Sequence, residues 1–186
     1  MKRLFDFVVA SCATVILLLP IAIVTLAVRL TSPGPVLYWS DRVGRNNSIF
    51  RMPKFRSMRG GTPAVATHLL SDPKAHLTPI GNFLRKSSLD ELPQIWNILK
   101  GDMSLVGPRP ALFNQDDLIE LRTREGVHVL PPGLTGWAQV NGRDELPIPA
   151  KVKLDREYLE CQSFWFDIRI LWMTFVKVLR RDGITH

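Results

Sequence analysis

Two adjacent carboxylates, Asp90 and Glu91, are the residues of this chain best suited to chemistry. Cations stand around them in the sequence, with Arg85 upstream and Arg109 downstream between two prolines. A carboxylate that approaches a phosphate is repelled by it, so an attack on phosphorus needs cations and a divalent metal to spread the charge. A rigidly presented guanidinium suits two phosphate oxygens. The pattern therefore indicates phosphate chemistry, for which an aspartyl phosphate is an established covalent intermediate.

The local sequence predicts that the pair begins a helix over residues 91–100, stopped by the glycine that follows. Asp90 is the expected N-cap, and Pro93 falls in the first turn, where its missing N–H is harmless. The positive end of the helix dipole should keep Asp90 ionised. Neighbours on a helix point in different directions, so one carboxylate can attack while the other binds a metal. A structural interpretation also stays open, because Ser88 and Glu91 fit a capping box.

Residues 7–28 form an apolar stretch of 22 residues without a charge. As a straight helix it would measure about 33 Å, close to the thickness of a bilayer core. Pro20 predicts a bend, and basic residues flank both ends, so the charge bias that orients a spanning helix is missing. Both observations favour a re-entrant helix, with Ser11 or Thr14 bonding carbonyls that the bend frees. A kinked spanning helix is the alternative.

The chain carries a formal net charge of +7, which suggests an anionic partner such as a lipid headgroup or a phosphorylated substrate. No nucleic-acid-binding module is legible, so we expect no nucleic acid partner. The four histidines lack the spacing of metal ligands. The two cysteines provide no disulfide framework and are consistent with a reducing compartment.

The rest of the chain predicts one domain of short strands and helices. Strands are expected over residues 36–39 and 48–52, and helices over residues 78–86, 114–124 and 150–160, the last of them solvated. Residues 59–77 indicate a surface loop, and residues 130–143 are rich in turn signals.

The last predicted helix, residues 163–181, places Arg169, Lys177 and Arg180 on one face beside large apolar residues. A basic face beside Trp and Phe is typical of a helix that lies among lipid headgroups. An apolar stripe on a helix also commonly packs on a domain core. Both interpretations stay open, and each can hold for different residues.

Several segments with distinctive residues follow one another from residue 2 to about residue 183: Lys2–Asp6, Arg42–Gly44, Lys54–Met58, Ser88–Gln94, Leu99–Ser104, Gly107–Pro110 and Gly133–Arg143. Together they resemble the bacterial sugar transferases, and more narrowly the small monotopic phosphoglycosyl transferases. The resemblance implies an enzyme that transfers a sugar 1-phosphate from a UDP-sugar to polyprenyl (undecaprenyl) phosphate and releases UMP, with Mg2+ as cofactor. The lipid-linked product would then pass to downstream glycosyltransferases.

The resemblance also implies roles for residues. Asp90 would be the nucleophile of a ping-pong mechanism through a phosphosugar-Asp90 intermediate, and Glu91 would position Mg2+, with Asp90 as a possible second ligand. Arg109 would bind the lipid or intermediate phosphate, with Arg85 supporting the pair. Weaker candidates for substrate binding are Lys54, Arg56, Gln139, Asn141 and Arg143. Structural roles are expected for Pro20, Asp6, Pro108 and Pro110.

The expected fold is therefore α/β and mostly helical. Residues 1–30 would form the re-entrant membrane helix bent at Pro20, and residues 31–186 a compact cytosolic catalytic domain with a small sheet and interfacial amphipathic helices. The enzyme would be monotopic in the bacterial inner membrane, contacting membrane lipids with its catalytic domain on the cytoplasmic face. Two rivals stay open: a transferase that forms no enzyme adduct and uses both carboxylates as metal ligands, and a non-enzymatic membrane adaptor.

Overall fold

The computed structural model describes residues 1–62, 72, 75–142 and 146–180, without the side chains of residues 179 and 180. This part of the chain is mostly helical and contains two small two-stranded sheets. The expectation of a mainly helical α/β fold with an apolar N-terminal helix is confirmed at this level. Most of the expected surface loop, and Arg143, lie outside the described residues.

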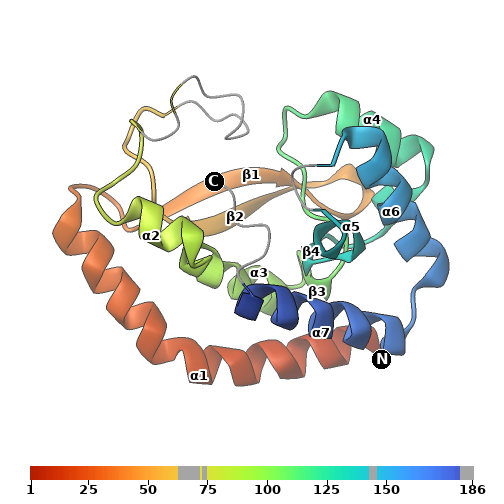
Figure 1. The fold of residues 1–186 in the computed structure, drawn as a ribbon, viewed down its shortest axis with the longest axis horizontal. Helices are drawn as coiled ribbons and strands as arrows, with labels where there is room; N and C mark the ends of the chain where they lie inside the picture. The colour runs from red at the N-terminus through yellow and green to blue at the C-terminus, as the bar shows by residue number, and fades with distance from the viewer. Residues whose placement is uncertain (63–71, 73–74, 143–145, 181–186) are drawn as a thin grey trace.

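Helix α1 (Lys2–Thr31) is one continuous helix with Pro20 inside it, and it curves along the lower edge of the molecule in Figure 1. Its length and composition would allow it to cross a membrane. The expected help from Ser11 and Thr14 is wrong. Their hydroxyls donate to the carbonyls of Phe7 and Ala10, whereas Pro20 frees the carbonyl four residues before it. The re-entrant path and the bend at Pro20 remain predictions.

Strands β1 (Leu37–Val43) and β2 (Ile49–Phe55) form an antiparallel hairpin with Leu37 opposite Phe55. A short 3-10 helix, η1 (Arg45–Asn47), makes the turn. Both predicted strands are in the right place but too short. The hairpin matters for the site because it places Lys54 on the strand that packs against the segment carrying Asp90.

A second, parallel pair joins β3 (Ser104–Val106) to β4 (Gly133–Thr135), and β4 lies in the stretch where the sequence predicted only turns. Glycines allow the two backbones to approach this closely. A Cβ on Gly133 would lie 2.1 Å from the Gly107 nitrogen, and a Cβ on Gly136 would lie 2.1 Å from the Gly107 oxygen. Such contacts leave no room for any side chain, so these glycines fix the course of the chain into residues 108–110.

The later helices are α4 (Asp116–Arg124), η4 (Val127–Val129), α5 (Trp137–Val140), α6 (Ile148–Cys161) and α7 (Phe164–Arg180). Helix α5 stands where a tight turn was expected. The prediction that α6 is solvated is wrong, because Val152, Asp155 and Tyr158 are buried. These three residues recur every third position and form one inward stripe, with an aspartate in its middle.

The core joins both ends of α1 to the rest of the molecule. Ala10 belongs to a cluster with β2, β3, α3 (Ile95–Lys100) and the C-terminal helices, and Val24 and Val28 belong to a second cluster with Phe55 and Leu84. Between Ala10 and Val24 no residue of α1 is buried. The helix is therefore attached at its two ends, and its apolar middle is exposed.

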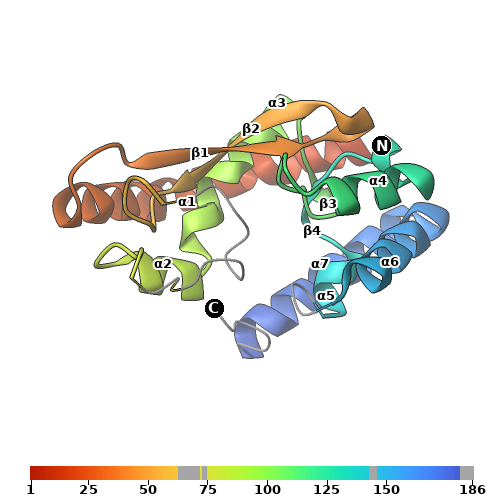
Figure 2. The same cartoon turned by 90° about the horizontal axis from the view of Figure 1, so that it is seen from above.

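Helix α7 fits both interpretations of its sequence, through different residues. Asp167 and Ile170 are buried, whereas Trp165, Trp172 and Phe175 are exposed. The side chain of Arg180 is outside the described residues. An ion pair of 2.6 Å between Lys2 and Asp167 joins the starts of α1 and α7, and Figure 2 shows the two helices diverging from there.

Candidate active site

The two carboxylates lie on a 3-10 helix, η3 (Leu89–Gln94), which runs directly into α3. Ser88 precedes it with φ 56°, in the left-handed region that residues other than glycine seldom adopt. The predicted N-cap role of Asp90 is therefore wrong, because the helix begins at Leu89 and Asp90 lies within its first turn. The Ser88 side chain makes no capping hydrogen bond either. The predicted end of the helix is confirmed: it stops at Lys100, before Gly101 with φ 105°.

Asp90 is buried, with 8% of its surface exposed. We find no hydrogen bond to its carboxylate from any residue that the structure describes. Burial raises the pKa of Asp90 to about 6, and Glu91 adds to the increase, against the attraction of Lys54, Arg85 and Arg109. We expected the helix dipole to favour the ionised form of Asp90, whereas its surroundings favour the protonated form. With a pKa of about 6, Asp90 is still mostly ionised at pH 7.

Glu91 has the opposite environment. Its Oε1 accepts hydrogen bonds from Lys54 Nζ at 2.7 Å and from an Arg109 Nη2 at 3.1 Å. Burial alone would raise the pKa of Glu91, but these two cations outweigh burial and hold the pKa well below its usual value. The two neighbouring carboxylates therefore differ, because one is fixed and firmly anionic and the other is protonated more easily and not held by hydrogen bonds.

The three cations near Asp90 come from separate parts of the chain. Lys54 is on β2, Arg109 follows β3, and Arg85 is on α2 (Gly81–Lys86), close enough to lower the pKa of Asp90. Helix α2 is held close to the end of β2, since a Cβ on Gly81 would lie 2.0 Å from the Ser57 oxygen. Segments from three parts of the chain thus surround one carboxylate pair with positive charge.

A magnesium ion fits the donor set of this pair. Carboxylate oxygens are the ligands that Mg2+ prefers, and it commonly binds through one or two carboxylates together with substrate phosphates. The hydrogen bonds from Lys54 and Arg109 both go to Oε1 of Glu91, and we find none to Oε2 among the described residues. No group of three or more potential metal ligands occurs within the described ranges, so such an ion would need oxygens from a substrate or water.

Other predicted site residues have different positions. The Arg56 guanidinium donates to the carbonyls of Ser32 and Pro33 at 2.7 Å, which ties β2 to the turn after α1. Gln139 Nε2 donates to the Leu134 carbonyl at 3.1 Å, and its buried Oε1 has no hydrogen-bond partner among the residues that the structure describes. Asn141 Nδ2 bonds back to its own helix. These contacts tie chain segments together, and their use in substrate binding remains a prediction.

The residues expected to have structural roles hold the segments around the site together. Asp6 is buried and accepts hydrogen bonds from the Ser104 hydroxyl at 2.8 Å and the Leu105 amide at 3.2 Å, which fixes α1 on β3. The carbonyls of Pro108 and Pro110 accept bonds from the Gly133 amide and from Arg42.

Sequence reasoning missed three buried polar residues near the site. Gln94 ends the same 3-10 helix, and within the described part of the chain its buried Nε2 has no hydrogen-bond partner. Arg122 and Asp155 form a buried ion pair of 2.6 Å. A signal for the arginine existed, because Arg122 follows the inward Leu118 by four residues and must share its face of α4.

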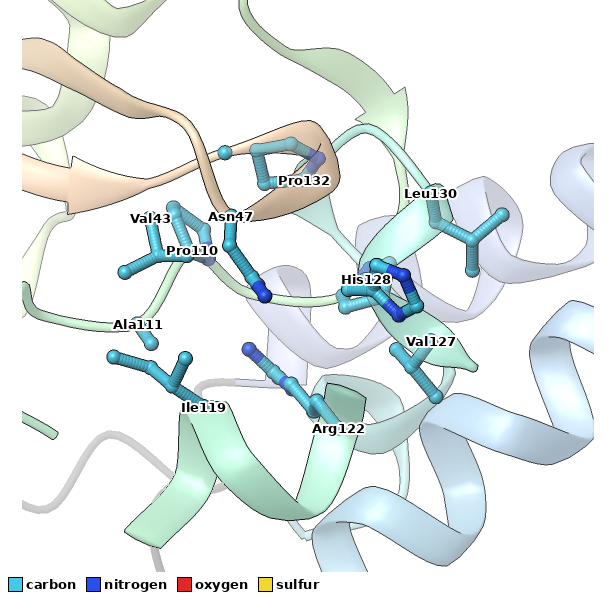
Figure 3. Close-up of a pocket in the computed structure, with 12 residues that line it drawn as sticks. Val43, Asn47, Pro110, Ala111, Ile119, Arg122, Val127, His128, Leu130 and Pro132 are labelled. Carbon is cyan, nitrogen blue, oxygen red and sulfur yellow. The ribbon is translucent and has the colours of Figure 1, made fainter. Parts of the chain in front are cut away.

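A small cavity lies beside residues 108–111, the segment that carries Arg109 (Figure 3). Pro108, Pro110, Arg122 and His128 help to line it, but neither carboxylate does. Its volume of about 30 Å³ is enough for little more than water. The buried Nδ1 of His128 accepts or donates no hydrogen bond among the described ranges, so a water molecule there would give it a partner. This cavity is too small for a sugar nucleotide.

Comparison with known proteins identifies the family of the chain. The sequence model of the bacterial sugar transferase family matches residues 1–181. The chain belongs to this family.

Individual relatives match nearly the whole chain. The uncharacterized sugar transferase EpsL of Bacillus subtilis (strain 168) is 42% identical over 190 residues, which is 99% of this chain and 90% of the relative. The UDP-glucose:undecaprenyl-phosphate glucose-1-phosphate transferase of Escherichia coli (strain K12) is 40% identical over 95% of this chain. The undecaprenyl-phosphate galactose phosphotransferase of Salmonella typhimurium is 39% identical over 98%. The chain spans 40% and 41% of the length of the latter two.

Proposed function

We propose that this protein transfers a sugar 1-phosphate from a UDP-sugar to undecaprenyl phosphate, with release of UMP, and so starts a lipid-linked glycan. The observation that carries the proposal is the buried Asp90 carboxylate, without a hydrogen bond from the described residues and surrounded by three cations. Relatives over 95% or more of this chain bear the names of undecaprenyl-phosphate sugar phosphotransferases.

The first step is an attack on the phosphorus next to the sugar. An oxygen of Asp90 forms a bond to this phosphorus, and the bond from phosphorus to the oxygen shared with the nucleoside phosphate breaks, so UMP leaves with the electron pair. The reaction needs Asp90 ionised, and a pKa of about 6 permits this at pH 7. Because no described residue donates a hydrogen bond to it, the Asp90 carboxylate keeps its lone pairs available for bond formation.

The second step returns the enzyme to its starting state. An oxygen of undecaprenyl phosphate attacks the same phosphorus, the bond from phosphorus to Asp90 breaks, and the carboxylate is freed as the sugar diphospholipid forms. Arg109 would bind the phosphate of the lipid or of the intermediate, and Arg85 would offset negative charge at Asp90. Both roles follow the attraction that these guanidiniums already exert on that carboxylate.

Glu91, and with it Asp90, would bind Mg2+. When bound, the ion would neutralise charge on the phosphates of the donor. Glu91 would present its oxygens in a fixed orientation, because Lys54 and Arg109 hold its Oε1. The depressed pKa of Glu91 would also keep this ligand ionised through the working pH range.

Helix α1 supports the proposed placement at a membrane. Arg3 donates to the carbonyls of Ile98 and Leu99, and Arg56 binds the turn just after the helix, so both ends of α1 are attached to one domain. Both ends must then face the same side of a bilayer, which supports the re-entrant path with a bend at Pro20. The exposed middle of α1 and the exposed aromatics of α7 would contact lipid, with the catalytic domain on the cytoplasmic face of the inner membrane.

The test is product analysis with the purified protein in lipid nanodiscs. It receives undecaprenyl phosphate, Mg2+ and, in turn, UDP-glucose, UDP-galactose and UDP-N-acetylgalactosamine. We expect UMP from at least one donor, together with a protein adduct of the mass of a phosphosugar on Asp90. Release of UDP would contradict phosphosugar transfer.

The same experiment separates the rival functions. UMP released only when the lipid is present, with no protein adduct in its presence or absence, would favour direct transfer with both carboxylates binding metal. No turnover with any donor, and no change of lipid binding in Glu91→Gln, would favour a membrane adaptor.

A further inference from the structure

The segment that carries Arg109 is held in an unusual way. Prolines at positions 108 and 110 remove two N–H donors, so the backbone must be fixed largely through its carbonyls. Four consecutive carbonyls do accept hydrogen bonds, each from outside the segment: Pro108 from the Gly133 amide at 2.9 Å, Arg109 from Arg122 Nη1 at 2.8 Å, Pro110 from Arg42 Nη1 at 3.2 Å, and Ala111 from the Val43 amide at 3.0 Å.

The bond to Arg109 itself comes from a buried arginine on α4. Arg122 is 8% exposed, and Figure 3 shows its side chain pointing from α4 toward the segment of Pro110. Its Nε and Nη2 donate to Asp155 Oδ2 at 3.0 and 2.6 Å, and Asp155 is 1% exposed. The planar guanidinium therefore joins a carboxylate of α6 on one edge to the Arg109 carbonyl on the other.

We propose that Arg122, held by Asp155, is a positioning residue that orients Arg109 toward Glu91 and the reacting phosphate. This inference rests on the phosphate-binding role proposed above for Arg109. An ion pair this deeply buried is a weak source of stability compared with apolar packing, so its geometry is the more useful property. A lysine could keep the charge, but it lacks the rigid fork that bonds two partners on different edges.

The proposal predicts that Arg122 acts only through Arg109, which a double-mutant cycle can measure. Arg122→Lys should lower kcat/KM about tenfold, because small displacements of a phosphate-binding group have large effects on rate. In an Arg109→Lys background the same change should lower kcat/KM by less than about twofold. The rates are measured as UMP release in single turnovers with enzyme in excess, so that slow variants stay measurable.

Arg124 provides the matched control, because it is an exposed arginine of the same helix paired with Glu120 at 2.9 Å. Arg124→Lys should leave kcat/KM unchanged in both backgrounds. Equal factors for Arg122→Lys in the parent and in the Arg109→Lys protein would overturn the proposal, since they would mean that Arg122 acts independently of Arg109.

A second readout does not depend on turnover. In protein labelled with 15N-arginine, the Nε–H resonance of Arg109, assigned by its loss in Arg109→Lys, should shift in Arg122→Lys and stay in place in Arg124→Lys. An unshifted resonance would overturn the positioning role even if the parent proved inactive, whereas an inactive parent with a shifted resonance would count against the proposed function alone.

If Arg122→Lys does not fold, Asp155→Asn replaces it in both measurements, because an Asn oxygen can still accept from Arg122. We expect a smaller loss of the same kind. If neither variant folds, the ion pair is needed for the fold as a whole, and the specific positioning role is wrong.

Discussion

Buried aspartates occur in two regions of this molecule, and their surroundings differ. Three of the buried aspartates in the described part of the chain connect elements of the fold through protein partners: Asp6 with Ser104 and Leu105, Asp155 with Arg122, and Asp167 with Lys2 and Tyr158. The fourth, Asp90, is also buried but accepts no hydrogen bond from the described residues.

The difference separates groups that stabilise the fold from a group kept for reaction. Burying a carboxylate without hydrogen bonds is unfavourable, and proteins generally avoid it. At Asp90 the unfavourable environment raises the pKa and leaves the oxygens available for a new bond. The cations nearby lower that cost through space and do not use up the lone pairs, which is the arrangement that a nucleophile requires.

The largest expected effect concerns Asp90 itself. Asp90→Asn should lower turnover by roughly 10⁴-fold or more, because the amide cannot form the bond to phosphorus. The phosphosugar adduct should disappear at the same time, which intact-mass spectrometry after addition of the donor would check. Substantial turnover in this variant would place the nucleophile elsewhere.

The second prediction tests the buried ion pair between Arg122 and Asp155. Arg122→Met should lower the free energy of unfolding by about 3–5 kcal/mol, because it leaves Asp155 buried without its ionic partner. Arg124→Met removes an exposed pair on the same helix and should change stability by less than about 1 kcal/mol. Chemical denaturation of both variants would measure the difference. Similar losses would mean that burial of the pair matters little.

The third prediction concerns pH, which should change the free energy of unfolding by about 3 kcal/mol through the titration of Asp90. The pKa of Asp90 is raised to about 6 in the folded protein, so folding favours its protonated form. The resulting stability is present below about pH 4 and lost as pH rises through 6. Asp90→Asn lacks this titration, so its stability relative to the parent should grow between pH 4 and 7, as measured by denaturation. A constant difference would exclude the raised pKa.

Activity should follow the same titration in the opposite direction. The rate of adduct formation should rise with pH and reach half its maximum near pH 6, where half of Asp90 is ionised. Rapid quenching of single turnovers between pH 5 and 8 would record it. A midpoint near 4 would indicate that Asp90 is as accessible to water as an ordinary surface aspartate.

The sequence predicted those parts of the fold that depend on local patterns. Apolar stretches, glycine stops and helical periodicity gave the N-terminal helix, the end of the helix at Gly101 and the helix of residues 114–124. It failed for the β3–β4 pair, because two strands of three residues are too short to show a period, and their pairing depends on glycines far apart in the chain.

The same distinction holds for the candidate site, where local patterns pointed to residues but not to properties of the assembled fold. The sequence grouped Asp90 and Glu91 with Arg85 and Arg109, and the structure brings both arginines to the pair. It also brings Lys54 there, which the sequence had suggested only as a weaker candidate for substrate binding. The sequence did not show that burial raises the pKa of Asp90, because burial is a property of the assembled fold. The Arg122–Asp155 pair was missed because its two residues lie on separate helices.

The smallest expected effect concerns the backbone before the carboxylates. Ser88 has φ 56°, and glycine adopts this region without the steric penalty, so Ser88→Gly should stabilise the protein by about 0.5–1 kcal/mol. The Ser88 side chain makes no capping hydrogen bond, so little is lost with it. If the left-handed residue serves only to turn the chain into η3, kcat should stay within about twofold of the parent. A large fall in kcat despite higher thermal stability would mean that the stiffness of serine at this position helps to hold Asp90 in place.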